Sequence, residues 1–287
     1  MPLSDEAKSA PAHRPLRGRF GADLWPRVAA AVALGLAALG IAWIGGLVFV
    51  AFWWIGSAIV LGEWQRIVRG ERLVERIAVG ALALAAAALF AMHNEALAAI
   101  AALVVGAAAV GWVAGPAARI WAGVGAVYAG ALVVSLGLLR ASPSYGLPAV
   151  VWLFAVVWGT DIAAYFAGRL IGGPRLWPSV SPGKTWSGAI AGAVAGGLLG
   201  LLLSGWTSRI DRLFCLGLAA AVVAELGDLF ESALKRRFGV KDSSRLIPGH
   251  GGLMDRLDAF IAASAFAALF AAANSNGSFI ASGLFRW

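Results

Sequence analysis

The sequence contains few of the residues on which soluble and secreted proteins depend. Charged residues make up only 13% of its 287 positions, against roughly 25% in an ordinary soluble domain. The single cysteine, Cys215, excludes an internal disulfide and indicates nothing about the redox compartment. Hydrophobic residues, in contrast, account for 60% of the chain, and 13 residues are tryptophan. This composition predicts an integral membrane protein.

Apolar runs of membrane-spanning length recur along the whole chain. A window of about 20 residues, which crosses a hydrocarbon core of ~30 Å, gives these candidate spans: 28–44, 46–62, 77–92, 96–113, 120–139, 148–167, 187–204, 213–231 and 257–273. The chain is therefore predicted to be an all-α, polytopic membrane protein of about nine helices. We expect a basic cytoplasmic tail (1–27), N-terminal transmembrane helices (28–145) and a C-terminal transmembrane catalytic region (146–287).

The net charge of +8 is distributed in a way that predicts orientation in a membrane. With the N-terminus in the cytoplasm, only four of the 23 Lys and Arg residues fall outside, namely Arg140, Arg209, Arg212 and Arg286. Such an asymmetry is typical of cytoplasmic loops. Because the basic residues lie between apolar segments, we expect membrane lipid and not nucleic acid as the anionic partner.

Two connections between the predicted spans differ from the others. The segments 168–186 and 235–256 are long, basic and rich in Gly and Pro, and both lie on the cytoplasmic side in this orientation. The other connections are mostly short or featureless. We therefore expect the functional residues at these two loops and at the helix ends beside them.

Acidic residues lie inside the apolar runs, where a carboxylate costs roughly 2.5–3.5 kcal/mol on insertion scales. They are Asp161 in the sixth span and Glu225 and Asp228 in the eighth. At about 1.5 Å per residue, all three lie roughly 18–22 Å from the outer surface. Asp255 and Asp258 begin the ninth span at the same level, three residues apart and thus on one helix face.

Carboxylates gathered at the inner edge of a bilayer would repel one another unless a cation joined them, and hard oxygen ligands favour Mg²⁺. Asp228 and Asp255 are the predicted metal ligands, and Glu225, Asp258 and Asp161 are further candidates. The alternative is that these acids form ion pairs with neighbouring Arg and Lys residues at the helix–loop boundary. We favour the metal for Asp228 and Asp255, because both lie on apolar helices beside a Gly-rich turn.

That turn, ProGlyHisGlyGly at residues 248–252, is a candidate phosphate site. Its glycines, Gly251 and Gly252 among them, expose backbone N–H groups just before a helix N-terminus, which suits an anion. His250 adds a polar side chain, although a lone histidine beside glycines is more often a structural cap.

The other loop contains SVSPGKTW at residues 179–186. Pro178 stands where a P-loop requires glycine, which excludes an ordinary Walker site. Ser181, Lys184 and Thr185 are nevertheless residue types that bind phosphate oxygens. The span that follows has glycines four residues apart, which predict a close-packed helix face: Gly188, Gly192, Gly196 and Gly200.

The stretch SALKRRFGVKDSSRLIPGHGGLMDRLD, residues 232–258, resembles the signature of the phosphatidate cytidylyltransferases (CDP-diacylglycerol synthases) throughout its length. ELGDLFES before it, TDIAAYFAGRLIGG and SPGKTW are also similar to stretches of that family. The resemblance covers roughly residues 150–273, whereas residues 1–145 match only as a set of spans. Gly183 and Ser187 depart from the family pattern, which has a second lysine and an acid at these positions.

The resemblance implies an enzyme that transfers CMP from CTP to phosphatidate and releases pyrophosphate. It implies Mg²⁺, with a second, monovalent cation as an open alternative, and it suggests a homodimer. The implied catalytic residues are Asp228, Asp255 and Lys184. Substrate-binding residues would be Ser181, Thr185, Lys235, Arg236, Lys241, His250, Gly251 and Gly252. The site would face the cytoplasm from the inner (plasma) membrane.

Other classes of protein remain as alternatives. A transporter or channel would place its acids near mid-bilayer with access from both faces, whereas most acids here lie at one edge. A CDP-alcohol phosphatidyltransferase requires an AspGly…AlaArg…Asp…Asp motif that this sequence lacks. A polyprenol or phytol kinase that uses CTP is closer in chemistry and differs in its acceptor.

Overall fold

The computed structural model describes residues 35–205, 209–244, 246, 251–276 and 279–286. In this part of the chain, eight helices are long and apolar enough to cross a membrane. They are α2 (Gly46–Val68), α3 (Leu73–Met92), α4 (Ala96–Val113), α5 (Arg119–Arg140), α6 (Gly146–Leu170), α7 (Trp186–Gly200, continued as a 3₁₀ turn, η2, Leu201–Gly205), α8 (Ile210–Arg237) and α9 (Met254–Asn274). The prediction of an α-helical, polytopic membrane protein is confirmed.

The first predicted span, 28–44, is described only in its second part. A shorter apolar helix covers Gly35–Ile44, and residues 28–34 lie outside the described residues, as does the predicted tail 1–27. Gly45 and Gly46, at the boundary between the first two predicted spans, both have positive φ, of 69° and 55°. Glycine adopts such a backbone without strain, and α2 begins there.

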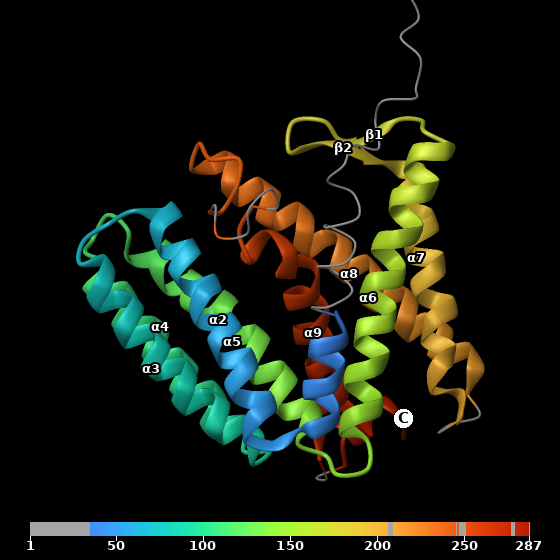
Figure 1. Ribbon diagram of the computed structural model, residues 1–287, viewed down its shortest axis with the longest axis horizontal. Helices are drawn as coiled ribbons and strands as arrows, with labels where there is room; N and C mark the ends of the chain where they lie inside the picture. Colours follow the sequence, from blue (N-terminus) through green and yellow to red (C-terminus); the bar gives the residue numbers. More distant parts are fainter. Residues whose placement is uncertain (1–34, 206–208, 245, 247–250, 277–278, 287) are drawn as a thin grey trace, which may run out of the picture. The chain divides into compact units, whose positions relative to one another are not determined.

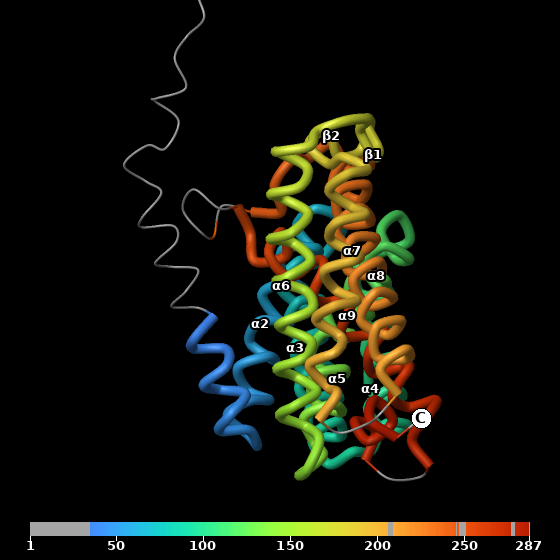
Figure 2. The backbone as a smooth tube through the Cα atoms, turned by 90° about the vertical axis from the view of Figure 1, so that its right-hand side faces the viewer, coloured from blue at the N-terminus to red at the C-terminus, as the bar shows by residue number. Residues whose placement is uncertain are grey.

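Within residues 41–287 the helices pack in two groups (Figures 1 and 2). Helices α2 to α5 contact one another, and α7 lies between α6 and α8. Helix α9 packs against both α5 and α8 and thereby joins the groups. At this junction the ring of Phe260 from α9 stacks on those of Trp53 (α2) and Phe154 (α6), with ring centroids 5.5 and 4.7 Å away.

Glycines bring α7 close to its neighbours. Gly188, Gly192, Gly196 and Gly200 are all buried. A Cβ atom at Gly188 would lie 2.8 Å from a backbone oxygen of α6, and one at Gly196 would lie 3.1 Å from a backbone oxygen of α8. The predicted close-packed face is therefore confirmed, and it sets the spacing of the three helices that surround the site described below.

The two segments predicted as loops, 168–186 and 235–256, both begin with helix. Helix α8 continues to Arg237, so Lys235 and Arg236 lie in its last turn and not in a loop. Helix α6 likewise continues to Leu170. The predicted spans end where charged residues begin, because hydropathy measures only how apolar a segment is. The helices extend further, because backbone hydrogen bonds also form between charged residues.

The remainder of the 168–186 segment contains an antiparallel hairpin. Strand β1 (Arg175–Trp177) pairs with β2 (Ser181–Thr185), and Thr185 lies opposite Arg175. The hairpin lies at the end of α6 and α7, toward the same end as the last turn of α8 (Figures 1 and 2). The sequence analysis predicted a loop here and did not predict this hairpin.

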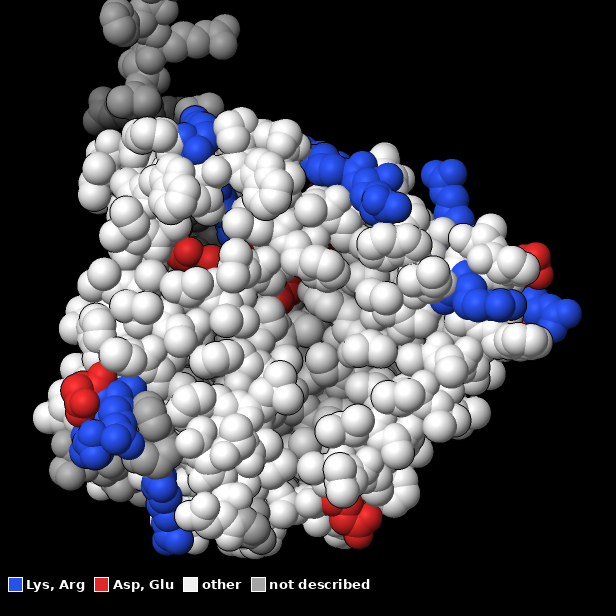
Figure 3. Space-filling view, turned by 180° about the vertical axis from the view of Figure 1, so that it is seen from behind, with Lys and Arg blue, Asp and Glu red and all other residues white. Residues whose placement is uncertain are grey.

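Charged side chains are unevenly distributed over the face of the molecule shown in Figure 3. Lys and Arg side chains lie mostly at the borders of the face, and its centre is uncharged except for acidic atoms visible in a recess. Large apolar side chains on the helices are exposed, for example Leu82, Val105 and Leu198. Such a surface suits lipid contact.

Candidate active site

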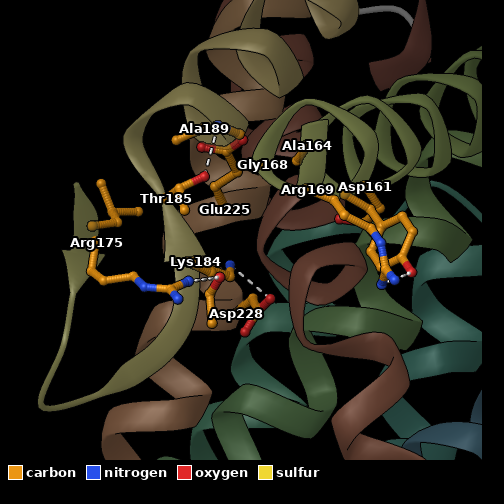
Figure 4. Close-up of a pocket in the computed structure, with 14 residues that line it drawn as sticks. Asp161, Ala164, Gly168, Arg169, Arg175, Lys184, Thr185, Ala189, Glu225 and Asp228 are labelled. Atoms are coloured by element: carbon orange, nitrogen blue, oxygen red, sulfur yellow. Dashed lines mark hydrogen bonds and ion pairs between the residues drawn. The ribbon is translucent and has the colours of Figure 1, made fainter. Parts of the chain in front are cut away.

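A cavity of about 550 Å³ lies between α6, α7, α8 and the hairpin (Figure 4). Its polar lining comprises three acids and three bases, together with Tyr165 and Thr185. The acids are Asp161, Glu225 and Asp228, and the bases are Arg169, Arg175 and Lys184. The cavity therefore brings together the three intramembrane acids that the sequence singled out and the lysine of the SPGKTW segment.

The shortest polar contact in the cavity joins Lys184 to Asp228. The Nζ atom of Lys184 lies 2.7 Å from the Oδ2 atom of Asp228. The other oxygen, Oδ1, accepts a 3.4 Å hydrogen bond from the Ser232 hydroxyl, one turn further along α8. Both charged side chains are about one third exposed, at 27% and 33%, so they remain accessible to a ligand in the cavity.

The hairpin and the start of α7 place Lys184. The hydroxyl of Thr185 accepts a 3.1 Å hydrogen bond from the Gly188 N–H group and so caps α7. It also lies 3.0 Å from the Ser187 hydroxyl. Arg175 donates a 3.1 Å hydrogen bond to the Gly183 carbonyl across the hairpin. These contacts fix the strand whose next-to-last residue is Lys184.

Thr185 thus lines the cavity, but its hydroxyl already serves the helix cap. Ser181 begins β2 opposite Trp177 and is not part of the cavity lining. Of the three phosphate-binding candidates in this segment, the structure brings only Lys184 and Thr185 to the cavity.

Glu225 projects toward α7 at a point where that helix has no side chain. A Cβ atom at Gly192 would lie 2.5 Å from the Oε1 atom of Glu225, so glycine makes room for the carboxylate. This oxygen is buried without a hydrogen-bond partner. A buried carboxylate oxygen without a donor is costly, and a cation would satisfy it.

Asp255 lies in a second set of contacts, at the start of α9. Its Oδ1 atom is 2.9 Å from the Nζ atom of Lys235. The backbone N–H groups of Ser243 and Gly252 donate to the carboxylate at 3.1 and 2.9 Å. The same lysine lies 2.7 Å from Glu231, which is almost fully buried. Lys235 thus forms an ion pair with both Glu231 and Asp255.

The glycines before α9 leave room for the Asp255 carboxylate and donate a hydrogen bond to it. Gly251 has a φ of 82°, and a Cβ atom there would lie 2.6 Å from the Oδ2 atom of Asp255. Gly252 supplies the N–H group just mentioned. In the described residues these two glycines therefore serve to position an acid, and their predicted contact with a phosphate stays a prediction.

The other predicted residues are placed as follows. Asp258 is buried, and its carboxylate accepts a 2.8 Å hydrogen bond from the Ala259 N–H group. Arg236 and Lys241 are exposed and are not part of the cavity lining. His250 lies outside the described residues.

The donor chemistry of the cavity fits a divalent cation, because Asp161, Glu225 and Asp228 offer carboxylate oxygens, one of them unsatisfied. However, the described residues contain no group of three or more His, Cys, Asp or Glu side chains already arranged to hold a metal. Asp228 and Asp255 also have different partners, Lys184 and Lys235. That these two acids share one cation stays a prediction.

Sequence reasoning missed three residues of this region. Arg169 and Arg175 line the cavity, and Glu63 of α2 binds the segment before α9. The spacing of Asp161, Tyr165 and Arg169, four residues apart on one face of α6, could have indicated the first. Glu63 had no such signal, because its partners are 180 to 191 residues away in sequence.

The fold and the site define a polytopic membrane protein with a cavity of mixed charge at one end of its helices. The chain matches the cytidylyltransferase family over residues 25–273 and belongs to that family. The family predicted from the SALKRR…DRLD stretch is thereby confirmed.

Curated relatives support the same assignment. A phosphatidate cytidylyltransferase of Brucella suis biovar 1 (strain 1330) is 41% identical over 258 residues, which cover 87% of this chain and 94% of the relative. The enzyme of that name from Haemophilus influenzae is 40% identical over 149 residues, covering 50% and 52% of the two chains. One from Staphylococcus epidermidis (strain ATCC 12228) is 43% identical over 121 residues, covering 41% and 46%.

Proposed function

We propose that the protein transfers CMP from CTP to phosphatidate and so forms CDP-diacylglycerol and pyrophosphate. The observation that supports this most is the cavity that joins Lys184, Arg169 and Arg175 to the acids of α6 and α8, in a chain whose relatives are named phosphatidate cytidylyltransferase. Both proposed substrates are polyanions, and both basic and cation-binding groups are needed to bring them together.

The reaction is a direct displacement. An oxygen of the phosphatidate monoester forms a bond to the α-phosphorus of CTP. The bond from that phosphorus to the bridging oxygen breaks, and its electron pair leaves with pyrophosphate. Phosphatidate is itself the nucleophile, so no covalent intermediate with the protein is required, and catalysis consists of positioning and electrostatic stabilisation.

The chain's own residues have distinct tasks in this proposal. Lys184, Arg169 and Arg175 bind phosphate oxygens, because they are the cationic side chains of the cavity. Asp228 orients Lys184 through their 2.7 Å ion pair. Arg236, in the last turn of α8, and Lys241, just after that helix, are exposed and attract anionic lipid at about 1 kcal/mol per charge. Lys235, in the same turn, is held by Glu231 and Asp255 and contributes to the site through them.

The residues that would hold Mg²⁺ are Asp228 and Asp255, with Asp161, Glu225 and Asp258 as further ligands. When bound, the cation would neutralise charge on the transferring phosphate and on the leaving pyrophosphate. A second, monovalent cation would occupy part of the same set of acids.

We place the site at the cytoplasmic face of the inner (plasma) membrane. CTP is a cytoplasmic nucleotide, and the phosphatidate headgroup lies at the interface while its acyl chains stay in lipid. The distribution of Lys and Arg in the sequence supports this orientation. A homodimer is part of the proposal, and cross-linking in detergent tests it.

Purified protein in detergent, supplied with labelled CTP, phosphatidate and Mg²⁺, tests the function. We expect labelled CDP-diacylglycerol and an equal amount of pyrophosphate, and no product after chelation of Mg²⁺. Phosphorylation of a polyprenol or phytol instead would indicate the CTP-dependent kinase. Ion flux in vesicles without turnover would indicate a transporter.

A further inference from the structure

Glu63 is a buried acid that belongs to neither set of contacts described above. It lies near the end of α2, and only 1% of its surface is exposed. Helix α2 belongs to the first half of the chain, which contributes no residue to the lining of the cavity. A charge buried to this degree must be compensated by hydrogen bonds or by opposite charge.

The compensation comes from the segment that precedes α9. One oxygen of Glu63, Oε1, accepts hydrogen bonds from the Ser244 hydroxyl at 2.6 Å and the Leu253 N–H group at 3.0 Å. The other, Oε2, accepts from the Ser243 hydroxyl at 3.1 Å and the Met254 N–H group at 2.7 Å. Each oxygen thus binds one residue from either side of residues 245–251.

Asp255 binds the same two sides. It accepts from the Ser243 N–H group at 3.1 Å and from the Gly252 N–H group at 2.9 Å. Ser243 therefore donates its backbone to Asp255 and its hydroxyl to Glu63. Two carboxylates, one from α2 and one from α9, hold the two stems of this segment together.

The carboxylate of Glu63 packs closely against Gly252, which has no side chain. A Cβ atom at Gly252 would lie 2.6 and 2.7 Å from the two carboxylate oxygens of Glu63 and would also overlap the Ser243 hydroxyl. The N–H groups of Leu253 and Met254 are at the N-terminus of α9, where they have no partner within the helix. The negative charge of Glu63 also suits the positive end of the helix dipole.

We propose that Glu63 is a positioning residue for the cytidylyl transfer. It fixes the stems of the 243–254 segment and the first turn of α9, and thereby the direction in which Asp255 points. This inference rests on the proposed function, because the effect of Glu63 on the reaction passes through Asp255. The N-terminal helices thus contribute to the site through one carboxylate and not merely as membrane spans.

Glu63→Gln tests the proposal, because it keeps the size of the side chain and replaces one accepting oxygen by an NH₂ group. The NH₂ group of the glutamine replaces either Oε1, which accepts from the Leu253 N–H group, or Oε2, which accepts from the Met254 N–H group. Because two donors then face each other, one backbone hydrogen bond is lost in either amide orientation. Glu75→Gln is the matched control, since Glu75 is exposed in the first turn of α3. Two quantities are measured: amide hydrogen exchange without added Mg²⁺, and the Mg²⁺ concentration that gives half-maximal turnover.

We expect faster exchange at Leu253 and Met254 in Glu63→Gln and a half-saturating Mg²⁺ concentration raised about 10- to 100-fold, as for residues that orient metal ligands. Glu75→Gln should match the wild type in both. A merely structural role would lower the amount of folded enzyme and leave the half-saturating concentration unchanged. That result, or unchanged exchange at the two amides, would overturn the proposal.

Serine substitutions cover the case in which Glu63→Gln does not fold. Ser243→Ala removes only the hydroxyl bond to Glu63 and keeps the backbone bond to Asp255, and Ser244→Ala removes the 2.6 Å bond to the other oxygen. The double variant should raise the half-saturating Mg²⁺ concentration, and wild-type behaviour would refute the inference. A wild-type protein that makes no CDP-diacylglycerol would instead refute the proposed function, and the exchange experiment would still report whether Glu63 holds the segment.

Discussion

Lys184→Ala removes the cation that contacts the acids of the cavity most closely. Its Nζ atom lies 2.7 Å from Asp228, and its side chain is 27% exposed. The substitution leaves Arg169 and Arg175 as the basic residues of the described cavity lining, facing Asp161, Glu225 and Asp228. If Lys184 binds a phosphate of CTP, the enzyme should lose affinity for the nucleotide, and the acids should repel it more strongly.

The expected magnitude follows from the contact that is lost. A hydrogen bond to a charged group contributes about 1.5–3 kcal/mol, and each 1.36 kcal/mol is a factor of ten. We therefore expect kcat/KM for CTP to fall about 10- to 150-fold. Stability should change by less than about 1 kcal/mol, because the ion pair is partly exposed and solvent screens it.

Steady-state kinetics with varied CTP at saturating phosphatidate measures the effect, and thermal unfolding in detergent checks the fold. Arg209→Ala is the control, because Arg209 lies 3.7 Å from Asp211 in an exposed ion pair at the start of α8. Its kinetics should equal those of the wild type. Unchanged kinetics for CTP in Lys184→Ala would refute the reasoning, since the cavity would then bind something other than the nucleotide phosphates.

Three further predictions concern the acids and the packing around them. Asp228→Asn and Asp255→Asn should each abolish turnover while the protein stays folded by circular dichroism, and near-normal turnover at saturating Mg²⁺ would remove the metal assignment. Thr185→Val should lower the stability by about 1 kcal/mol in thermal unfolding, because the cap of α7 is lost; an unchanged melting temperature would contradict this. Gly192→Ala should cost about 1–3 kcal/mol by the same measurement, because the new Cβ atom would lie 2.5 Å from a carboxylate oxygen of Glu225.

The sequence alone predicted the helices well, because a membrane restricts what apolar runs of about 20 residues can do. The predicted ends of α6 and α8 were too early, because hydropathy indicates where the hydrocarbon core ends and not where the hydrogen-bonded helix ends. The hairpin Arg175–Thr185 was missed for a related reason. Its strands are short, and their pairing depends on the Pro- and Gly-containing turn between them more than on apolar periodicity.

Part of the site was also predictable. Asp161, Glu225 and Asp228 stood out because each interrupts an apolar run, and helix geometry gave their common depth. Their gathering around one cavity follows from the packing of α6, α7 and α8 through glycines four residues apart. What the spacing could not show is which base meets which acid, because Lys184 reaches Asp228 only through the hairpin.

Ion pairing also changes how substitution of these acids must be interpreted. The Lys184–Asp228 pair is partly exposed, so the partner that remains after either substitution is still solvated and the fold loses little stability. Asp228→Asn both removes an oxygen ligand and leaves Lys184 without its carboxylate, while Lys184→Ala does the reverse. If the pair mattered only as a pair, the two variants would lose the same activity. If Asp228 also contacts a cation or substrate, Asp228→Asn must lose more activity than Lys184→Ala. Only a larger loss in Asp228→Asn supports a catalytic role for Asp228.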